Sequence, residues 1–272
     1  MRNSQHILKR RLAGTALGGT ISSLRDRYIL LNSAWVNSPE LGDRRNNAIA
    51  GFLVSRLRRP GRTFVDVGAH IGSVLGQALL NASGPVIAFE AIPAKAEHLR
   101  RRFPEATIHN VALLDREGET SFFIDNAQSG FSSLDKHRDD LTEIKVRLSQ
   151  LDTLVETDDV DVIKIDVEGA ELGVLRGSEA VVARCRPVIM FESGPNPPLG
   201  YTLEGLWRWF DDHDYFVYFP DRISRAARAV TLEVFVDSHE YPRRTLNYFG
   251  IPKERLAEAA ERARRLLREP PH

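Results

Sequence analysis

The chain has 272 residues, enough for one large hydrophobic core, and its 42% hydrophobic and 27% charged residues are typical of a globular protein. Its 37 basic and 37 acidic residues give a formal net charge of zero, which disfavours binding to nucleic acid or to an anionic membrane through overall charge. A single cysteine, Cys185, excludes an internal disulfide, and no apolar stretch has the length of a signal peptide or a membrane span, so we expect a cytoplasmic protein with no membrane span.

Residues 1–60 carry helical rather than strand patterns. Near the end of this stretch, apolar residues recur at helical spacing, namely Ile49, Phe52, Leu53 and Leu57. Pro60-Gly61 ends the segment, and residues 1–40 show little core-forming pattern before Leu24. We therefore predict an N-terminal helical cap over residues 1–60.

From Thr63 onward, short apolar runs alternate with helical stretches. Strands are expected at 63–67, 86–90, 107–111, 162–166 and 187–191. Helices are expected near 73–82, 93–102, 171–184 and 202–213. Two short β segments and a polar loop or lid between them are expected at 119–124, 144–148 and 125–143. This alternation is the sequence form of βαβ units, so residues 61–250 are predicted to form an α/β, Rossmann-like domain with a mostly parallel twisted sheet and helices on both faces.

The last third of the chain adds an edge to this sheet. Two apolar runs at 215–219 and 231–236 are joined by a short polar connection, which predicts an antiparallel edge hairpin. Residues 251–272 contain an amphipathic helix over 252–268, which we expect to pack on the domain. The chain is therefore predicted to be one domain overall.

The first strand leads into a glycine loop with the pattern Asp66-x-Gly68-x-His70-x-Gly72. A strand that ends in such a loop and opens onto a helix is the ligand-cradling geometry of doubly wound α/β proteins, because glycine lets the backbone approach the ligand. The dinucleotide pattern G-x-G-x-x-G is not met, since positions 70 and 73 are His and Ser. A carboxylate at Asp66 would repel a pyrophosphate but suits a cationic ligand such as S-adenosylmethionine, which carries a sulfonium and an amino group.

Glu90 ends the second strand, about twenty residues beyond the start of the glycine loop. An acidic residue at this point is placed to accept both ribose hydroxyls of an adenosine. NAD and S-adenosylmethionine both contain that group, so Glu90 predicts a nucleoside cofactor without choosing between them. The alternative is a carboxylate that caps the helix beginning near Pro93.

Acidic residues also end the next two parallel strands. Asp166 and Glu168 follow the fourth strand, Glu192 ends the fifth, and Glu171 is expected in the first turn of the next helix. Because the carboxyl ends of parallel strands meet at one rim, we expect these side chains near Asp66. Clustered carboxylates are costly unless they meet a cation or abstract a proton, which makes Asp166, Glu168 and Glu192 candidates for a general base or for ligands of a divalent metal such as Mg²⁺. The alternative is a solvated loop with helix capping.

Several segments together resemble the FkbM family of S-adenosylmethionine-dependent methyltransferases. In chain order they read FVDVGAHIGS, VIAFEAIPAKAEHL, NVALLDREGE, SGFSSL, RLSQLDTL, IKIDVEGAELGVLRG and VIMFES, across about residues 63–193. The resemblance implies the class I methyltransferase fold. As in many members of the family, it also implies methylation of a hydroxyl oxygen on a sugar, a glycolipid or a polyketide-type metabolite, in natural product biosynthesis.

The same resemblance implies which residues hold the cofactor. They are Asp66, Gly68, Ala69, His70, Gly72, Glu90, Ala91, Asn110, Val111 and Asp166. The glycine loop would line the methionine end of the cofactor, Glu90 would bind its ribose, and Asn110 and Val111 would lie near its adenine. His70 stands where the family more often has asparagine, and Ala-Ile-Pro follows Glu90 in place of the commoner Pro-x-Pro. His70 is therefore either a polar residue of the loop or a reacting base, and the loop role is favoured.

Methyl transfer to a hydroxyl needs a base or a metal ion, and the residues expected to serve catalysis are Asp166, Glu168, Glu192 and His70. The other histidines without supporting spacing are expected to be structural or exposed, namely His109, His137, His213 and His239. Two further functions stay open: a nicotinamide-dependent oxidoreductase, which the missing third glycine disfavours, and a non-catalytic scaffold that keeps the cofactor pocket. The expected partner is a small-molecule or glycosylated acceptor, and a homo-oligomer is compatible with the sequence.

Overall fold

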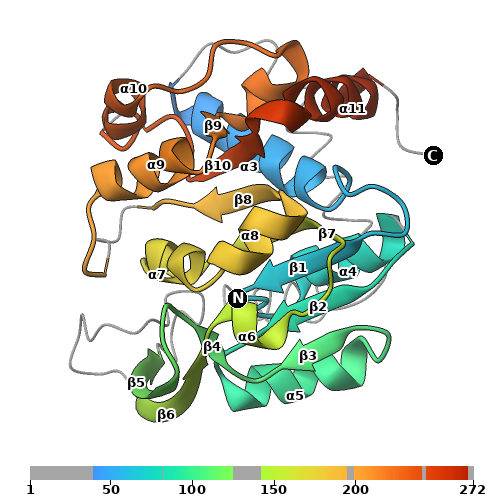
Figure 1. The fold of residues 1–272 in the computed structure, drawn as a ribbon, viewed down its shortest axis with the longest axis vertical. Helices are drawn as coiled ribbons and strands as arrows, with labels where there is room; N and C mark the ends of the chain where they lie inside the picture. Colours follow the sequence, from blue (N-terminus) through green and yellow to red (C-terminus); the bar gives the residue numbers. More distant parts are fainter. Residues whose placement is uncertain (1–38, 82, 125–141, 195–198, 241–242, 269–272) are drawn as a thin grey trace, which may run out of the picture.

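The computed structural model describes residues 39–81, 83–124, 142–194, 199–240 and 243–268. Their centre is a seven-stranded sheet with the strand order β3-β2-β1-β7-β8-β10-β9 (Figure 1). The strands are β1 (Thr63–Val67), β2 (Val86–Phe89), β3 (Thr107–His109), β7 (Val160–Ile165), β8 (Val188–Glu192), β9 (Tyr215–Tyr218) and β10 (Asn247–Pro252). The first five of these are parallel where they pair, and β10 runs antiparallel to both of its neighbours. The mostly parallel sheet expected from the sequence is confirmed.

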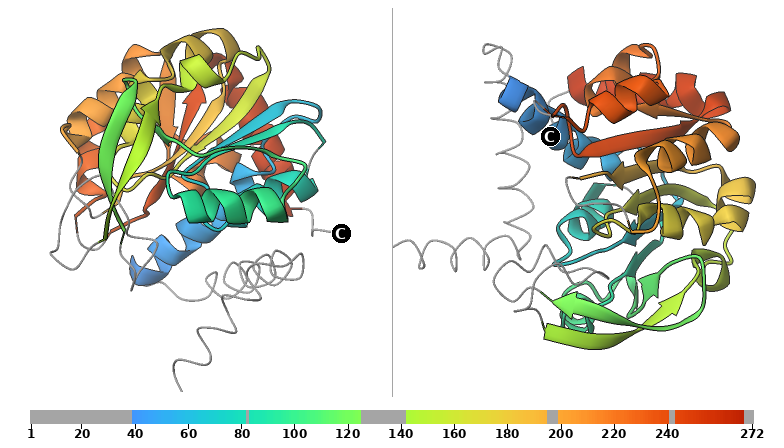
Figure 2. Two further views of the ribbon diagram at one scale, coloured as in Figure 1. Left: turned by 90° about the horizontal axis from the view of Figure 1, so that it is seen from below. Right: turned by 90° about the vertical axis from the view of Figure 1, so that its left-hand side faces the viewer.

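Helices cover both faces of this sheet (Figure 2, left). They are α3 (Pro39–Val54), α4 (Ser73–Asn81), α5 (Pro93–Arg102), α6 (Leu151–Leu154), α7 (Glu171–Arg176), α8 (Glu179–Cys185), α9 (Leu203–Asp212), α10 (Leu232–Asp237) and α11 (Leu256–Arg268), with 3-10 turns η1 (Pro220–Arg225) and η2 (Lys253–Arg255). Helices α7 to α10 contribute to one buried apolar cluster, and α3, α4, α5 and α11 contribute to another. Within β1, Phe64 belongs to the second cluster and Val65 to the first. The central strands are thus buried on both faces, which explains their continuous apolar runs.

The antiparallel edge differs from the sequence prediction. Residues 231–236, expected as a strand, lie in α10, whose first turn is capped by Thr231: its Oγ1 accepts a hydrogen bond from the N–H of Val234 at 3.4 Å. The antiparallel partner of β9 is instead β10, which lies between β8 and β9. A short apolar run fits a buried helix as well as a strand, and here packing against the sheet decided for the helix. The predicted helix 171–184 is interrupted too: α7 ends at Arg176 with Gly177 at its C-cap, and α8 begins at Glu179.

A second sheet of three strands stands at one end of the molecule (Figure 2, right). Its strands are β4 (Ala112–Leu113), β6 (Thr142–Ser149) and β5 (Gly118–Ile124), in that order. The two short β segments expected from the sequence are confirmed as β5 and β6. Residues 142–143, expected in the loop, begin β6, and the remainder of that loop, 125–141, lies outside the described residues. This sheet packs on the segment after β7 through Leu114, Leu148 and Ala170.

Both terminal segments contribute to the main core. α3 and α11 belong to the buried cluster that contains Phe64, and α11 confirms the amphipathic helix. Residues 1–38 and 269–272 lie outside the described residues, so the helical cap is described only from residue 39. The division of the chain at residues 60 and 250 stays a prediction. Among the helices that the structure describes, none is both long and apolar enough to cross a membrane.

Candidate functional site

A cavity of about 220 Å³ lies at the carboxyl ends of β1, β2, β7 and β8. This rim is where open α/β sheets bind their ligands. Its lining comes from the ends of β1, β2 and β8, from the segments after β1, β2, β3 and β7, and from β4 and β5 of the second sheet. It comprises Val67, Gly68, His70, Phe89, Glu90, Ala91, Ile92, Lys95, Val111, Ala112, Leu113, Phe122, Asp166, Val167, Glu168, Ala170 and Glu192. One part of the wall is apolar and aromatic, and another part carries several carboxylates.

The glycine loop after β1 is packed against its neighbours at two points. Gly68 has φ +78°, and a Cβ atom there would lie 1.9 Å from the carbonyl oxygen of Asp166. A Cβ atom at Gly72 would lie 2.4 Å from the ring of Phe103, so this second glycine serves the packing of α5 rather than the cavity. The N–H groups of residues 68 and 69 both donate to the carbonyl oxygen of Phe89 at 3.0 Å, which ties the loop to the end of β2.

Glu90 connects the glycine loop to the loop after β2. Its Oε2 accepts a hydrogen bond from the N–H of His70 at 2.8 Å, and its Oε1 accepts one from the N–H of Ile92 at 2.9 Å. Burial raises the pKa of Glu90, while these two hydrogen bonds and the charge of Lys95 oppose the rise. Each carboxylate oxygen of Glu90 keeps a second lone pair. Since Glu90 lines the cavity, these oxygens can still accept a hydrogen bond from a ligand hydroxyl.

Asn110 stabilises the loop after β2 through its side-chain amide. Its Nδ2 donates to the carbonyl oxygens of Glu90 at 2.8 Å and of Ala91 at 2.9 Å. Asn110 itself does not line the cavity, whereas its neighbour Val111 does. The amide therefore fixes the loop that presents Glu90.

The apolar part of the wall was only partly visible in the sequence. It consists of Phe89, Ile92, Val111, Leu113 and Phe122. Ile92 and Lys95 lie in the segment after Glu90, next to a predicted site residue. Phe122 comes from β5, and no signal in the sequence indicated that the second sheet would reach this cavity.

Asp66 lies elsewhere than the sequence argument placed it. Its side chain is fully buried, and it does not line the cavity. Its Oδ1 lies 3.1 Å from the Nζ of Lys164, which also lies 3.4 Å from Oδ2 of Asp166 and donates to the carbonyl oxygen of Gly68 at 2.6 Å. Burial alone would lower the pKa of Lys164, but the charges of Asp66 and Asp166 outweigh it and raise the pKa, so the ammonium stays charged.

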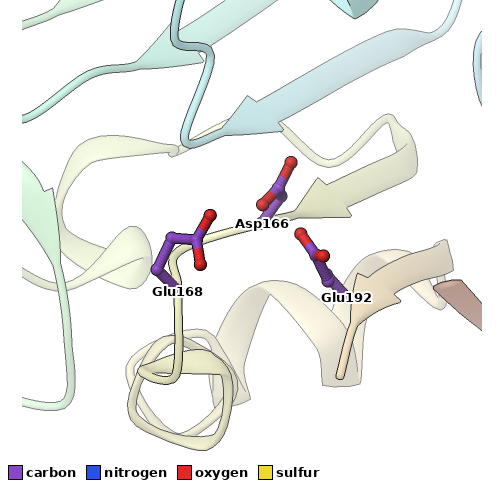
Figure 3. A group of neighbouring side chains, drawn as sticks. All are labelled: Asp166, Glu168 and Glu192. Atoms are coloured by element: carbon purple, nitrogen blue, oxygen red, sulfur yellow. The ribbon is translucent and has the colours of Figure 1, made fainter. Parts of the chain in front are cut away.

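Three carboxylates meet at the rim between β7 and β8 (Figure 3). Asp166, Glu168 and Glu192 each offer one oxygen, and these atoms lie within 4.8 Å of one another. Glu168 has φ +55°, a conformation that few residues other than glycine adopt, and the turn around it directs its carboxylate toward Asp166. The sequence prediction that these side chains gather at one rim is confirmed.

Glu171 stabilises the turn that carries Glu168. Its buried carboxylate accepts a hydrogen bond from the N–H of Gly169 at 3.0 Å and another from the hydroxyl of Tyr201 at 2.5 Å. α7 begins at Glu171, as expected for an acidic residue in a first helical turn. Its role in the site is therefore to fix the segment that carries Glu168.

Asp166 and Glu192 differ in the direction in which their pKa values are shifted. Burial and then the charge of Asp166 raise the pKa of Glu192 to about 10, so this carboxyl is protonated at neutral pH. Burial would also raise the pKa of Asp166, but the charge of Lys164 and a hydrogen bond from Glu192 outweigh it and lower the pKa. The pair thus consists of a protonated Glu192 that donates to an ionised Asp166, an arrangement that can bind a cation or accept a proton.

The other predicted residues divide between the wall and its support. Among the predicted cofactor residues, the wall includes Gly68, His70, Glu90, Ala91, Val111 and Asp166, but not Asp66, Ala69, Gly72 or Asn110. The described histidines outside the glycine loop do not line the cavity: His109 stacks on Phe89, His213 bonds Glu179, and His239 bonds Ser193. His137 lies outside the described residues.

Comparison with known protein families gives a match that includes every residue lining the cavity. Residues 66–217 match the methyltransferase FkbM domain. No curated protein matches the sequence. Among solved structures, the chain is similar to methyltransferase FkbM from Methylobacillus flagellatus KT, with 13% identity, a TM-score of 0.43, and coverage of 83% of this chain and 59% of that one.

Two further solved structures have lower TM-scores. Precorrin-6y C5,15-methyltransferase from Geobacter metallireducens GS-15 has 17% identity and a TM-score of 0.37, covering 63% of this chain and 73% of that one. Magnesium protoporphyrin IX methyltransferase from Synechocystis PCC 6803 with bound S-adenosylmethionine has 10% identity and a TM-score of 0.36, covering 79% and 83%. The chain spans 59% of the length of the Methylobacillus structure.

Proposed function

Since the matched domain covers more than half of the chain, this protein belongs to the FkbM methyltransferase family, and we propose that it transfers the methyl group of S-adenosylmethionine to a hydroxyl of a sugar, a glycolipid or a polyketide-type metabolite. The observation that carries this proposal is one cavity whose wall joins an aromatic and apolar part to a carboxylate-rich part. S-adenosylmethionine has the same division, because its adenine is flat and its methionine end carries positive charge.

The residues present fit this cofactor part by part. Phe89, Val111 and Phe122 offer apolar and aromatic surface for the adenine. Glu90, held by two backbone N–H groups, is placed to accept from the ribose hydroxyls. Gly68 lets the backbone approach the methionine end, and the ionised Asp166 supplies negative charge there.

The chain's own groups would then act on the acceptor. S-adenosylmethionine supplies a methyl group bonded to a positively charged sulfur. The sulfur keeps the electrons of the C–S bond when that bond breaks. Asp166 is the group placed to take the proton of the acceptor hydroxyl, so that the new O–C bond forms as the proton moves to the carboxylate. Glu192, by donating to Asp166, and Lys164, by pairing with it, keep that carboxylate ionised. His70 lines the same cavity and is the alternative base.

A divalent cation is a second use of the same cluster. Three carboxylate oxygens within 4.8 Å of one another form a hard donor set of the kind that Mg²⁺ prefers. The ammonium of Lys164, 3.4 Å from Asp166, already neutralises part of that charge, which favours the base over the metal. Calorimetric titration of MgCl₂ into the protein with bound S-adenosylhomocysteine separates the two: heat that disappears in Glu168→Gln establishes the metal site.

Ligand titration of the purified protein tests the cofactor. We expect S-adenosylmethionine and S-adenosylhomocysteine to bind and NAD not to bind; binding of NAD alone would establish the oxidoreductase alternative. Transfer of a labelled methyl group is then measured on pairs of acceptors that differ only in one hydroxyl. Transfer to the hydroxylated member of a pair supports the proposal, whereas tight cofactor binding with no transfer across sugars, glycolipids and polyketide alcohols supports the scaffold alternative.

A further inference from the structure

We propose that Lys164 is a positioning residue for methyl transfer, and that Asp66 acts as its counter-ion rather than as a contact of the cofactor. The proposal rests on the function inferred above and concerns the same site. It assigns one task to a buried pair: to hold the glycine loop and Asp166 in a fixed relation.

The strand register brings the pair together. Asp66 of β1 and Lys164 of β7 are paired residues of neighbouring parallel strands, so their side chains leave the sheet on the same face. Asp166 lies two residues beyond Lys164, which places it on that face as well. Three charged side chains therefore line up across two strands whose other residues are buried and largely apolar.

The ion pair between Asp66 and Lys164 is buried. Asp66 is fully buried and Lys164 is 4% exposed. Lys164 is a cation within ion-pair distance of Asp66, with 3.1 Å between its Nζ and Oδ1. An unpaired charge in such a place is strongly unfavourable, so an ionised Asp66 requires Lys164, whereas Lys164 also pairs with Asp166.

Lys164 also contacts the wall of the cavity, which a purely structural pair would not do. Its Nζ donates to the carbonyl oxygen of Gly68 at 2.6 Å, and Gly68 lines the cavity. The same Nζ lies 3.4 Å from Oδ2 of Asp166, whose side chain is 37% exposed. The ammonium of Lys164 therefore holds both the glycine loop, which faces the proposed cofactor, and Asp166, which faces the proposed acceptor.

Asp66 has no such access. Its side chain is fully buried and does not line the cavity. Its influence on the cofactor is therefore assigned to Lys164, the partner that contacts both Gly68 and Asp166. Two roles of Asp66 can therefore be distinguished by experiment: direct contact with the cofactor, or action through Lys164.

A double-mutant cycle tests the distinction. The variants are Lys164→Met, Asp66→Asn and the double variant, which removes both charges and keeps the size of both side chains. The dissociation constants of S-adenosylhomocysteine and S-adenosylmethionine are measured by calorimetry, and the melting temperature of each variant is measured alongside. Lys145→Met, on the exposed part of β6, is the matched control and should bind as the wild type does.

We expect Lys164→Met and Asp66→Asn each to weaken both ligands by about tenfold or more, and the double variant to bind no worse than the weaker single variant. Additive losses, or a loss by Asp66→Asn confined to the positively charged S-adenosylmethionine, would mean that Asp66 meets the cofactor directly and would overturn the proposal. A lowered melting temperature with unchanged dissociation constants would overturn it too, because the pair would then be only structural.

The double variant keeps the test decisive if Lys164→Met alone fails to fold, since it no longer leaves the charge of the fully buried Asp66 unpaired. Its comparison with Asp66→Asn then decides: equal affinities support the proposal, and a further loss in the double variant shows independent roles and overturns it. Failure of the wild type to bind either ligand would instead refute the proposed function on which the inference rests.

Discussion

The Cα atom of Gly68 faces the carbonyl oxygen of Asp166 so closely that a Cβ atom at residue 68 would lie 1.9 Å from it. The glycine loop and the segment after β7 are therefore in backbone contact at the place where the cofactor is proposed to bind. Neither backbone can yield without moving the other, and both line the cavity.

Gly68→Ala is expected to disrupt this contact and to abolish binding of S-adenosylhomocysteine. The added methyl group collides with backbone rather than with a flexible side chain, and φ +78° costs about 1–2 kcal/mol for a residue with a Cβ atom. Gly61→Ala is the matched control, because its φ is +79° and a Cβ atom there meets nothing within 4 Å. Calorimetry should therefore show normal binding in Gly61→Ala and none in Gly68→Ala; equal losses would mean that backbone strain, not the contact, is responsible.

Glu90→Ala is expected to weaken the binding of S-adenosylhomocysteine strongly. The substitution removes the acceptor proposed for the ribose and leaves the N–H groups of His70 and Ile92 without their partner, at about 1–3 kcal/mol for each buried group left unsatisfied. Glu97→Ala, on the exposed side of α5, serves as the control. Wild-type affinity in Glu90→Ala would contradict the assignment of this cavity to a nucleoside.

Glu192→Gln is expected to stabilise the protein at neutral and alkaline pH. The pKa of Glu192 is raised from 4.5 to about 10 in the folded protein, so folding favours the protonated form. Stability from this group is fully present below about pH 4.5 and is lost as the pH rises toward 10, because the unfolded chain releases the proton first. Glutamine resembles the protonated carboxyl and donates to Asp166 in the same way, without this loss.

The measurement is the difference in melting temperature between Glu192→Gln and the wild type across that pH range. We expect the difference to grow with pH, by about 2–4 °C for each kcal/mol of stabilisation. Glu204→Gln, on the exposed face of α9, should give a difference that does not change with pH. A wild type that gains stability over the variant as the pH rises would show that Glu192 is ionised in the fold.

Much of the site followed from strand periodicity. The carboxyl ends of parallel strands share one rim, so Glu90, Asp166 and Glu192 could be brought together from the positions at which their strands end. The same rule placed Asp66 there, but Asp66 lies inside β1, whereas Asp166, on the same face, lies one residue beyond the end of β7. Asp66 lies one residue before the end of β1 and projects into the interior, where Lys164 of the adjacent strand meets it.

The remaining differences arise from tertiary packing. Phe122 reaches the cavity only because the second sheet packs on Ala170, a contact between distant segments that no local pattern encodes. The run 231–236 is apolar enough for a strand or for a buried helix, and the antiparallel position in the sheet was filled by β10 instead. Both differences depend on contacts between segments far apart in the chain, which local sequence patterns do not encode.

His70 has a backbone role in the glycine loop and a side chain that lines the cavity, and one pair of variants can separate the two. Its backbone has φ +51°, and its N–H donates to Glu90 at 2.8 Å. Asparagine tolerates this left-handed conformation, whereas a β-branched residue does not. His70→Asn is therefore expected to keep the affinity for S-adenosylhomocysteine, and His70→Val to lose about 1–3 kcal/mol of stability, with weaker binding.

Methyl transfer by His70→Asn then decides the role of the imidazole. If His70 belongs only to the loop, the rate and its pH dependence stay those of the wild type, because Asp166 remains to take the proton. A large fall in rate at unchanged cofactor affinity would contradict the loop role and make the imidazole the base, since binding and chemistry would have been separated in one substitution.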